Sequence, residues 1–132
     1  MIYLDSSVVV AEVFAEDVHP EAPFWAESRF LASRLLEYEV WTRVHSRGFG
    51  VSHGDAIRAI LVGVSFLELV TPVLARALEP FPVPVRTLDA LHLATIEFLR
   101  SQGQAPSLAT YDRRLSLAAR ALDIPLVDLA QS

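Results

Sequence analysis

The chain has 132 residues and no cysteine, a length typical of one domain whose core needs no disulfide or structural zinc. Its content of 52% hydrophobic and 20% charged residues excludes intrinsic disorder, and the lack of cysteine excludes thiolate catalysis. The formal net charge of −5 argues against a protein that holds nucleic acid by positive charge alone. The longest uncharged apolar run, residues 59–67, is too short to cross a bilayer. We expect one soluble, cytoplasmic domain over residues 1–132, without a secretory signal or a membrane partner.

Short apolar runs alternate with capped or amphipathic stretches along the chain. The apolar runs predict strands over 2–4, 30–32, 66–70, 107–110 and 125–127. Helices are predicted over 8–14, 23–28, 34–47, from a capping box at 52–55 to 62, from 71 to before Pro80, over 88–101 and over 112–122. Ser6 or Ser7, Ser33 and Thr87 are the expected caps. Because the strands are continuously apolar, we expect an α/β sandwich, with a central parallel sheet flanked by helices.

Four acidic residues stand where an acid is unexpected. Asp5 and Asp112 follow predicted strands, and ligands of open α/β sheets bind beyond the carboxyl ends of the strands. Glu39 and Asp89 share helical stripes with apolar residues, where an ionised carboxylate is costly unless it is paired or metal-bound. Two like charges about 4 Å apart repel by roughly 4 kcal/mol at an effective dielectric of about 20. A divalent cation with a preference for oxygen, Mg²⁺ or Mn²⁺, removes that cost.

Each acid also has a simpler explanation. Asp5 and Asp112 are placed to cap the helices that follow them. Glu39 precedes Arg43 by four residues, the spacing of a surface ion pair on a helix. Asp89 lies in a first helical turn, where the helix dipole favours an acid. The sequence alone leaves these alternatives open for each residue, and only the convergence of all four favours a metal site.

Four motifs carry a resemblance to a known family. They are Y-L-D-S-S-V at 3–8, S-x-L-x-x-x-E-x-x-x-R at 33–43, R-T-L-D-A-L-H-L-A at 86–94 and A-T-Y-D-R-R-L at 109–115. In this order they resemble the PIN-domain family, specifically the VapC-like toxins of toxin–antitoxin pairs. The resemblance runs nearly from end to end of the chain and implies a PIN-like three-layer sandwich.

The resemblance implies a metal-dependent endoribonuclease. Asp5, Glu39, Asp89 and Asp112 are then the catalytic and metal-binding acids, holding one or two Mg²⁺ or Mn²⁺ ions, with Asp5 and Asp89 as the direct ligands. Attack by water implies products with a 5′-phosphate and a 3′-hydroxyl. The family further implies an RNA substrate, a cognate antitoxin that lies across the active-site groove, with helices 8–14 and 34–47 as candidate walls, and a homodimer.

Several neighbouring side chains are candidates to support that site. Ser6 and Thr110 are expected to orient a carboxylate or a metal-bound water, and Arg86 and Arg113 to bind RNA phosphate. A cap or turn explains the two hydroxyls equally simply, and a surface pair or a solvated helix face explains the two arginines. His92 follows Asp89 by one turn and is expected to be a packed core histidine rather than a ligand or general base.

Other functions fit the sequence less well. A catalytically inactive PIN-fold binding domain lacks one of the four acids, and all four are present here. A receiver-like or phosphatase domain needs a lysine late in the chain, which has none. A non-toxin PIN nuclease, acting in RNA processing or on structured DNA, is the nearest chemical alternative. For DNA, a chain of this size and charge leaves little room for the basic segments required.

Overall fold

The computed structural model describes residues 1–27 and 29–129, so Ser28, the predicted end of the second helix, lies outside the described residues. Its strands are β1 (Ile2–Leu4), β2 (Phe30–Ser33), β3 (Val64–Leu67) and β4 (Ser107–Ala109). Its helices are α1 (Ser6–Val13), α2 (Ala22–Glu27), α3 (Leu35–Ser46), α4 (Gly50–Leu61), α5 (Thr71–Ala77), α6 (Thr87–Ser101) and α7 (Arg113–Ala121). Helices and strands follow one another nearly as the apolar pattern predicts.

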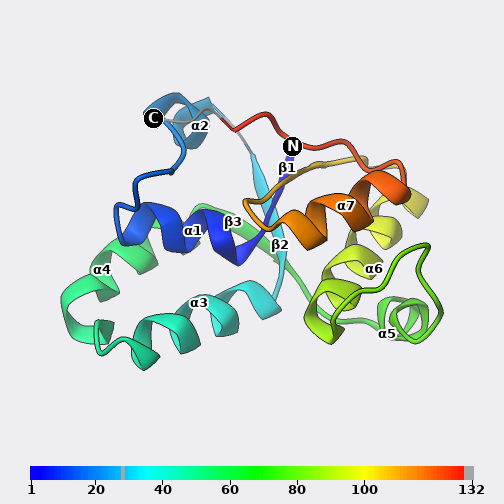
Figure 1. Ribbon diagram of the computed structural model, residues 1–132, viewed down its shortest axis with the longest axis horizontal. Coiled ribbons are helices and arrows are strands. Elements are labelled where there is room, and N and C mark those ends of the chain that lie inside the picture. The colour runs from blue at the N-terminus through cyan, green and yellow to red at the C-terminus, as the bar shows by residue number, and fades with distance from the viewer. Residues whose placement is uncertain (28, 130–132) are drawn as a thin grey trace.

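The four strands form one parallel sheet in the order β3-β2-β1-β4. The sheet lies between two layers of helices, with α1, α3 and α4 on one side and α5, α6 and α7 on the other (Figure 1). The predicted three-layer α/β sandwich is therefore confirmed. Parallel strands end at the same side of a sheet, so the residues that follow β1 and β4 become neighbours although they are far apart in the sequence.

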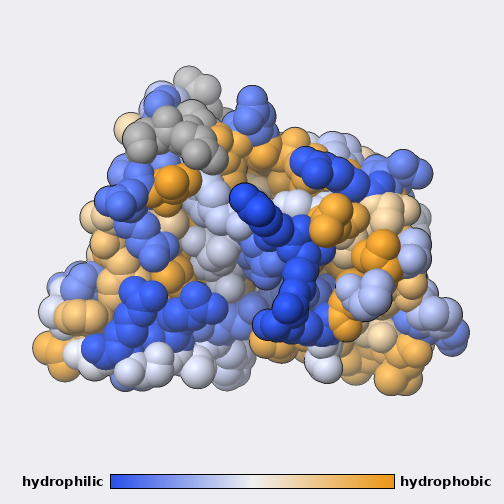
Figure 2. Space-filling model, in the orientation of Figure 1, coloured by the Kyte–Doolittle hydropathy of each residue, from blue (hydrophilic) through white to orange (hydrophobic). Residues whose placement is uncertain are grey.

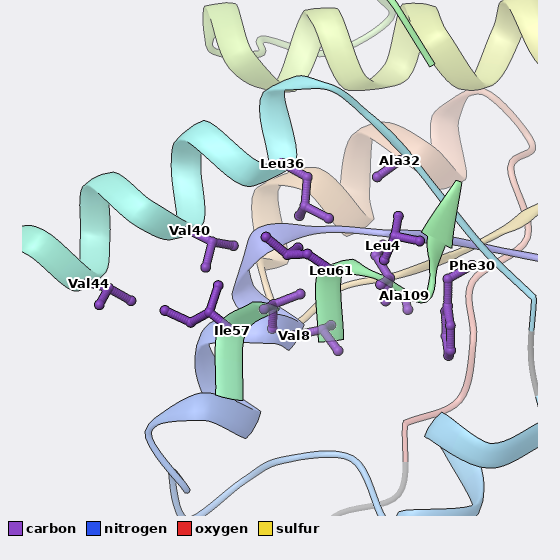
Figure 3. Close-up of a cluster of buried hydrophobic side chains, with 12 residues drawn as sticks. Leu4, Val8, Phe30, Ala32, Leu36, Val40, Val44, Ile57, Leu61 and Ala109 are labelled. Atoms are coloured by element: carbon purple, nitrogen blue, oxygen red, sulfur yellow. The ribbon is translucent and has the colours of Figure 1, made fainter. Parts of the chain in front are cut away.

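The alternation of side chains along the strands divides the interior into two cores. Leu4 on β1 and Ala32 on β2 contribute to the core beneath α1, α3 and α4, where Leu36, Val40 and Val44 of α3 form a buried stripe (Figure 3). Tyr3 and Leu31 contribute to the other core, with Leu93, Ile96 and Leu99 of α6. The packing of α3 and α6 against opposite faces fixes the helices that carry Glu39 and Asp89.

Two strand predictions were wrong in detail. The third strand begins and ends earlier than the predicted 66–70, because its pairing with β2 sets Val64 opposite Phe30. Val70 instead precedes α5 as its N-cap. The segment 125–127 makes a single isolated bridge, between Leu126 and Leu108, rather than a strand.

The helix starts also differ from the predictions. Helix α4 begins at Gly50 after Phe49, and the Ser52 hydroxyl donates to the Phe49 carbonyl, so the capping box at 52–55 was wrong. Arg86, not Thr87, is the N-cap of α6, and it makes no side-chain cap. The N-cap of α3 is likewise Arg34 rather than Ser33, although the Ser33 hydroxyl accepts the Leu35 N–H. No helix among the described residues is both long and apolar enough to be a membrane span.

We predict that Leu36→Ala destabilises the protein by about 2–5 kcal/mol, the usual cost of a cavity at a fully buried leucine. Urea denaturation measures the change. The matched control is Leu78→Ala, at a side chain that is 87% exposed, with an expected change within about 0.5 kcal/mol. Equal effects of the two substitutions would contradict the described packing of α3.

Candidate active site at the carboxyl end of the sheet

Asp5 directly follows β1 and is the N-cap of α1. Its side chain is buried, with a relative exposure of 6% for the residue. The Oδ2 atom accepts hydrogen bonds from the Ser7 hydroxyl at 2.6 Å, the Thr110 hydroxyl at 2.8 Å and the Ser7 N–H at 3.4 Å. Since Thr110 follows β4, these bonds join the carboxyl ends of two neighbouring strands. Every hydrogen bond described for the Asp5 carboxylate goes to Oδ2, which leaves Oδ1 available.

The Ser7 hydroxyl is the one that contacts Asp5, whereas Ser6 was the residue predicted from the sequence. Ser7 Oγ also accepts the Tyr111 N–H at 3.0 Å, which ties the start of α1 to the segment after β4. Ser6 instead lines an open hollow of about 390 Å³ together with Glu39 and Arg43. Because the two serines are consecutive, the sequence alone does not indicate which of them turns toward Asp5.

Glu39 reaches the same region from α3. Its Oε1 lies 2.5 Å from Nε2 of His92, which is buried in α6 with a relative exposure of 1%. The Glu39 partner is therefore this histidine rather than Arg43, the surface pair considered from the sequence. The carboxylates of Asp5 and Glu39 and the His92 ring each offer one atom, and these atoms all lie within 4.8 Å of one another.

Asp89 belongs to the same group of charges. Burial raises the pKa of Asp89, and the negative charges of Asp112 and Asp5 raise it further, against the lowering effects of an Arg86 backbone hydrogen bond and of His92. Neighbouring negative charges favour the protonated form of an acid, and a bound divalent cation reduces this repulsion. The charges of Asp5 and Asp112 thus act on Asp89, and of these acids Asp5 also shares the cluster with Glu39 and His92.

Asp112 combines two of the roles that the sequence left open. It is the N-cap of α7, and its Oδ1 accepts the Arg114 N–H at 2.9 Å and the Leu115 N–H at 3.3 Å. The charge of the same carboxylate acts on Asp89. Capping a helix and contributing to an acidic site are therefore compatible, because a carboxylate has two oxygens.

Arg86 and Arg113 flank the acids at helix starts. Arg86 is the N-cap of α6 and Arg113 is the first residue of α7, and both are exposed. Neither makes an ion pair within residues 1–27 and 29–129. Hydrophilic side chains gather at the centre of the face in Figure 2, over the place where α1 and α7 begin in Figure 1.

His92 is more than a packed core histidine. Its Nδ1 lies 2.7 Å from the Tyr3 hydroxyl, so both ring nitrogens have partners. Burial lowers the pKa of His92, but the hydrogen bond to Glu39 and the charges of Glu39, Asp5 and Asp89 outweigh it, and the pKa is raised overall. The spacing of His92 from Asp89 placed it on α6 but gave no sign of Glu39 as a partner.

The donor set fits a hard divalent cation. Carboxylate oxygens are the ligands that Mg²⁺ and Mn²⁺ prefer, and Mg²⁺ keeps several waters of its own. Asp5 and Glu39 each use one oxygen for a protein hydrogen bond, and among residues 1–27 and 29–129 their second oxygens have no hydrogen-bond partner and are available to a cation. Burial is the largest cause of the raised pKa of Asp89, and the negative charges of Asp112 and Asp5 add to it.

Comparison with known proteins identifies the family. A family model described as PIN domain matches residues 2–121, and the chain belongs to the PIN-domain family. Among curated proteins, the ribonuclease VapC35 of Mycobacterium tuberculosis is 31% identical over 137 residues, covering 100% of this chain and 99% of the relative. The ribonuclease VapC46 of the same species is 32% identical over 128 residues, with 96% and 95% covered.

Solved structures show the same fold. VapC20 of Mycobacterium tuberculosis, described as a sarcin–ricin loop cleaving toxin, matches with a TM-score of 0.69 at 20% identity and covers 100% of this chain and 98% of its own. PAE2754 of Pyrobaculum aerophilum matches with a TM-score of 0.58 at 19% identity, covering 92% and 89%. At such low identities these likenesses concern the fold alone.

We predict that the metal-free protein loses stability as the pH rises through the neutral range. The native pKa of His92 lies above the ordinary value of 6.5, so its contribution is complete below 6.5 and is lost as the pH rises through the native pKa. Asp89, raised above 3.8, acts with the same sign at lower pH. Thermal unfolding in EDTA over a pH series measures how the melting temperature changes with pH.

The substitution His92→Gln should flatten this pH dependence, and His53→Gln on α4 should leave it parallel to that of the wild type. A wild-type stability that increases between about pH 6 and pH 8, or the same slope in His92→Gln, would contradict the assignment.

We also predict that Asp89→Asn raises the melting temperature of the metal-free protein, because it removes a charge that burial and two carboxylates oppose. Saturating Mg²⁺ should reverse or reduce the difference, since the wild type alone keeps the full set of acids. The control Asp128→Asn, at an exposed acid, should leave the melting temperature unchanged both without metal and with saturating Mg²⁺. A lower melting temperature of Asp89→Asn without metal is the contrary result.

Proposed function

We propose that the protein is a metal-dependent endoribonuclease and the toxin of a toxin–antitoxin pair. The observation that carries the proposal is the convergence of Asp5 and Glu39, with Asp89 and Asp112 close enough to act on one another's charge, in a member of the PIN-domain family. The full-length relatives that are named ribonucleases support the choice of RNA as the substrate.

The four acids provide the binding site for Mg²⁺ or Mn²⁺. When bound, such an ion lowers the pKa of a coordinated water and stabilises negative charge on a phosphodiester. Asp5 and Asp89 are the proposed direct ligands, and Glu39 and Asp112 hold a second ion or orient water. The hydrogen bonds from Ser7 and Thr110 fix the Asp5 carboxylate in one orientation.

The substrate contacts are proposed at the rim of this site. Arg86 and Arg113 are exposed at helix starts beside the acids, where a guanidinium can bind an RNA phosphate bidentately. Ser6 lines the hollow along α3 and is placed for the sugar–phosphate backbone. Thr110 acts through Asp5, which it holds by a hydrogen bond. Hydrolysis by water gives a 5′-phosphate and a 3′-hydroxyl.

The proposal includes a protein partner. A nuclease toxin requires an inhibitor until it is needed, and the hollow along α3, with exposed Tyr38 and Arg43 in its wall, is a surface that an antitoxin segment can cover. We further propose that the protein is a homodimer, which sedimentation equilibrium of the purified chain tests. Co-expression with the gene product encoded beside it tests the antitoxin.

We predict that Asp5→Asn and Glu39→Gln each reduce Mg²⁺-dependent RNA cleavage by at least about a hundredfold, because each removes a charge and a ligand from the site. Cleavage of a labelled RNA pool measures the rate, and circular dichroism checks the fold. The matched control is Asp55→Asn, an exposed acid paired with Arg58 on α4, which should retain full activity.

The same assay distinguishes the alternatives. Cleavage of flap or single-stranded DNA but not RNA indicates a DNA nuclease, and binding of RNA without cleavage at any divalent ion concentration indicates an inactive binding domain. Equal cleavage in EDTA contradicts the metal-dependent mechanism. The loss of cleavage in both variants, with a retained fold and an active Asp55→Asn control, is the expected result.

A further inference from the structure

A continuous chain of hydrogen bonds leads from the sheet to Glu39. The Ser33 N–H at the end of β2 donates to the Tyr3 hydroxyl at 3.0 Å. The Tyr3 hydroxyl lies 2.7 Å from Nδ1 of His92, and Nε2 of His92 lies 2.5 Å from Oε1 of Glu39. Tyr3, Ser33 and His92 are all buried. Residues from β1, β2, α3 and α6 are thereby connected without passing through solvent.

The Glu39 carboxylate determines the direction of the chain. A carboxylate oxygen accepts, so Nε2 of His92 donates to Oε1 of Glu39 in the neutral ring and in the imidazolium alike. In the neutral ring Nδ1 then carries no hydrogen and accepts from the Tyr3 hydroxyl, whose oxygen accepts the Ser33 N–H. The contact with Glu39 is a donated hydrogen bond in either protonation state.

The burial of these groups makes the arrangement specific. Burial raises the pKa of Tyr3, so the phenol keeps its hydrogen. Tyr3 and His92 also meet edge to face, with ring centroids 5.7 Å apart and an interplanar angle of 76°, which limits rotation of the imidazole. A buried polar network is stable only when each member has its partner, and here the last acceptor is Glu39.

We propose that Tyr3 and His92 are positioning residues for Glu39. His92 engages Oε1 and so holds the Glu39 carboxylate beside Asp5, leaving the second oxygen for a divalent cation. His92 itself is not a metal ligand, although its ring lies within the cluster, because both nitrogens are engaged in the chain. The inference rests on the proposed function for the existence of a cation site, but it does not depend on which substrate the protein cleaves.

Direct observation of the His92 ring tests the proposal on the wild-type protein. In a long-range ¹H–¹⁵N NMR spectrum recorded above the native pKa of His92, which is itself raised above the ordinary 6.5, the neutral ring should show the tautomer with hydrogen on Nε2. Saturating Mg²⁺, which is diamagnetic, should leave that hydrogen in place. Its loss on addition of Mg²⁺ would mean that His92 is a ligand and would overturn the proposal.

A double-mutant cycle tests whether the two residues act through Glu39. Calorimetric titration with Mn²⁺, without RNA, should show a loss of affinity of about tenfold to a hundredfold in His92→Leu and a smaller loss in Tyr3→Phe, the range usual for residues that orient a metal ligand. His92→Gln keeps an N–H donor and should restore part of the affinity. In the Glu39→Gln background, His92→Leu should change the remaining affinity by less than about twofold.

The control is Ile96→Val, a buried change one turn further along α6, with Mn²⁺ affinity expected to remain within about twofold. An equal loss from His92→Leu with and without the Glu39 carboxylate, or no loss in either background, would overturn the proposal. If a variant does not fold, the NMR result on the wild type decides. A protein that binds Mn²⁺ as predicted but cleaves no RNA rejects the nuclease and leaves the positioning role standing.

Discussion

Repulsion between carboxylates brought together at the carboxyl end of the sheet is the constraint on which the site depends. The chain places Asp5 and Glu39 within a few ångströms and adds the charges of Asp89 and Asp112. The apolar packing of α3 and α6 on opposite faces of the sheet holds these acids in place although they repel. Hydroxyl, amide and imidazole donors offset part of this repulsion, and the proposed divalent cation would offset the rest.

Local patterns were enough to predict the layers of the fold and to single out four acids as candidates for the site. The continuous apolar strands indicated a sheet covered on both faces, and the structure has α1, α3 and α4 on one face and α5, α6 and α7 on the other (Figure 1). Asp5 and Asp112 follow strands, a position visible in the sequence, and Glu39 and Asp89 stood out as acids on apolar stripes. These features depend on spacings of a few residues.

The pairing of the side chains could not be predicted because the partners are distant in the chain. Thr110 was expected to orient a carboxylate, but no local pattern indicated that this carboxylate is Asp5, 105 positions away. The contact of Tyr3 with His92, 89 positions away, had no local signal either. The contact of Ser7, rather than Ser6, with Asp5 depends on the direction in which a side chain turns in the folded protein. The same holds for the contact of His92 with Glu39. The start of β3 depends likewise on its register with β2, which no local pattern encodes.

Anomalous diffraction from a crystal soaked in Mn²⁺ tests the central claim most directly, because it locates the ion without reference to any activity. The account predicts a single region of anomalous density among the carboxylates of Asp5, Glu39 and Asp89, with one or two peaks and no nitrogen of His92 as a ligand. Density that is absent there at saturating Mn²⁺, or that appears only at other acids on the surface, would contradict it.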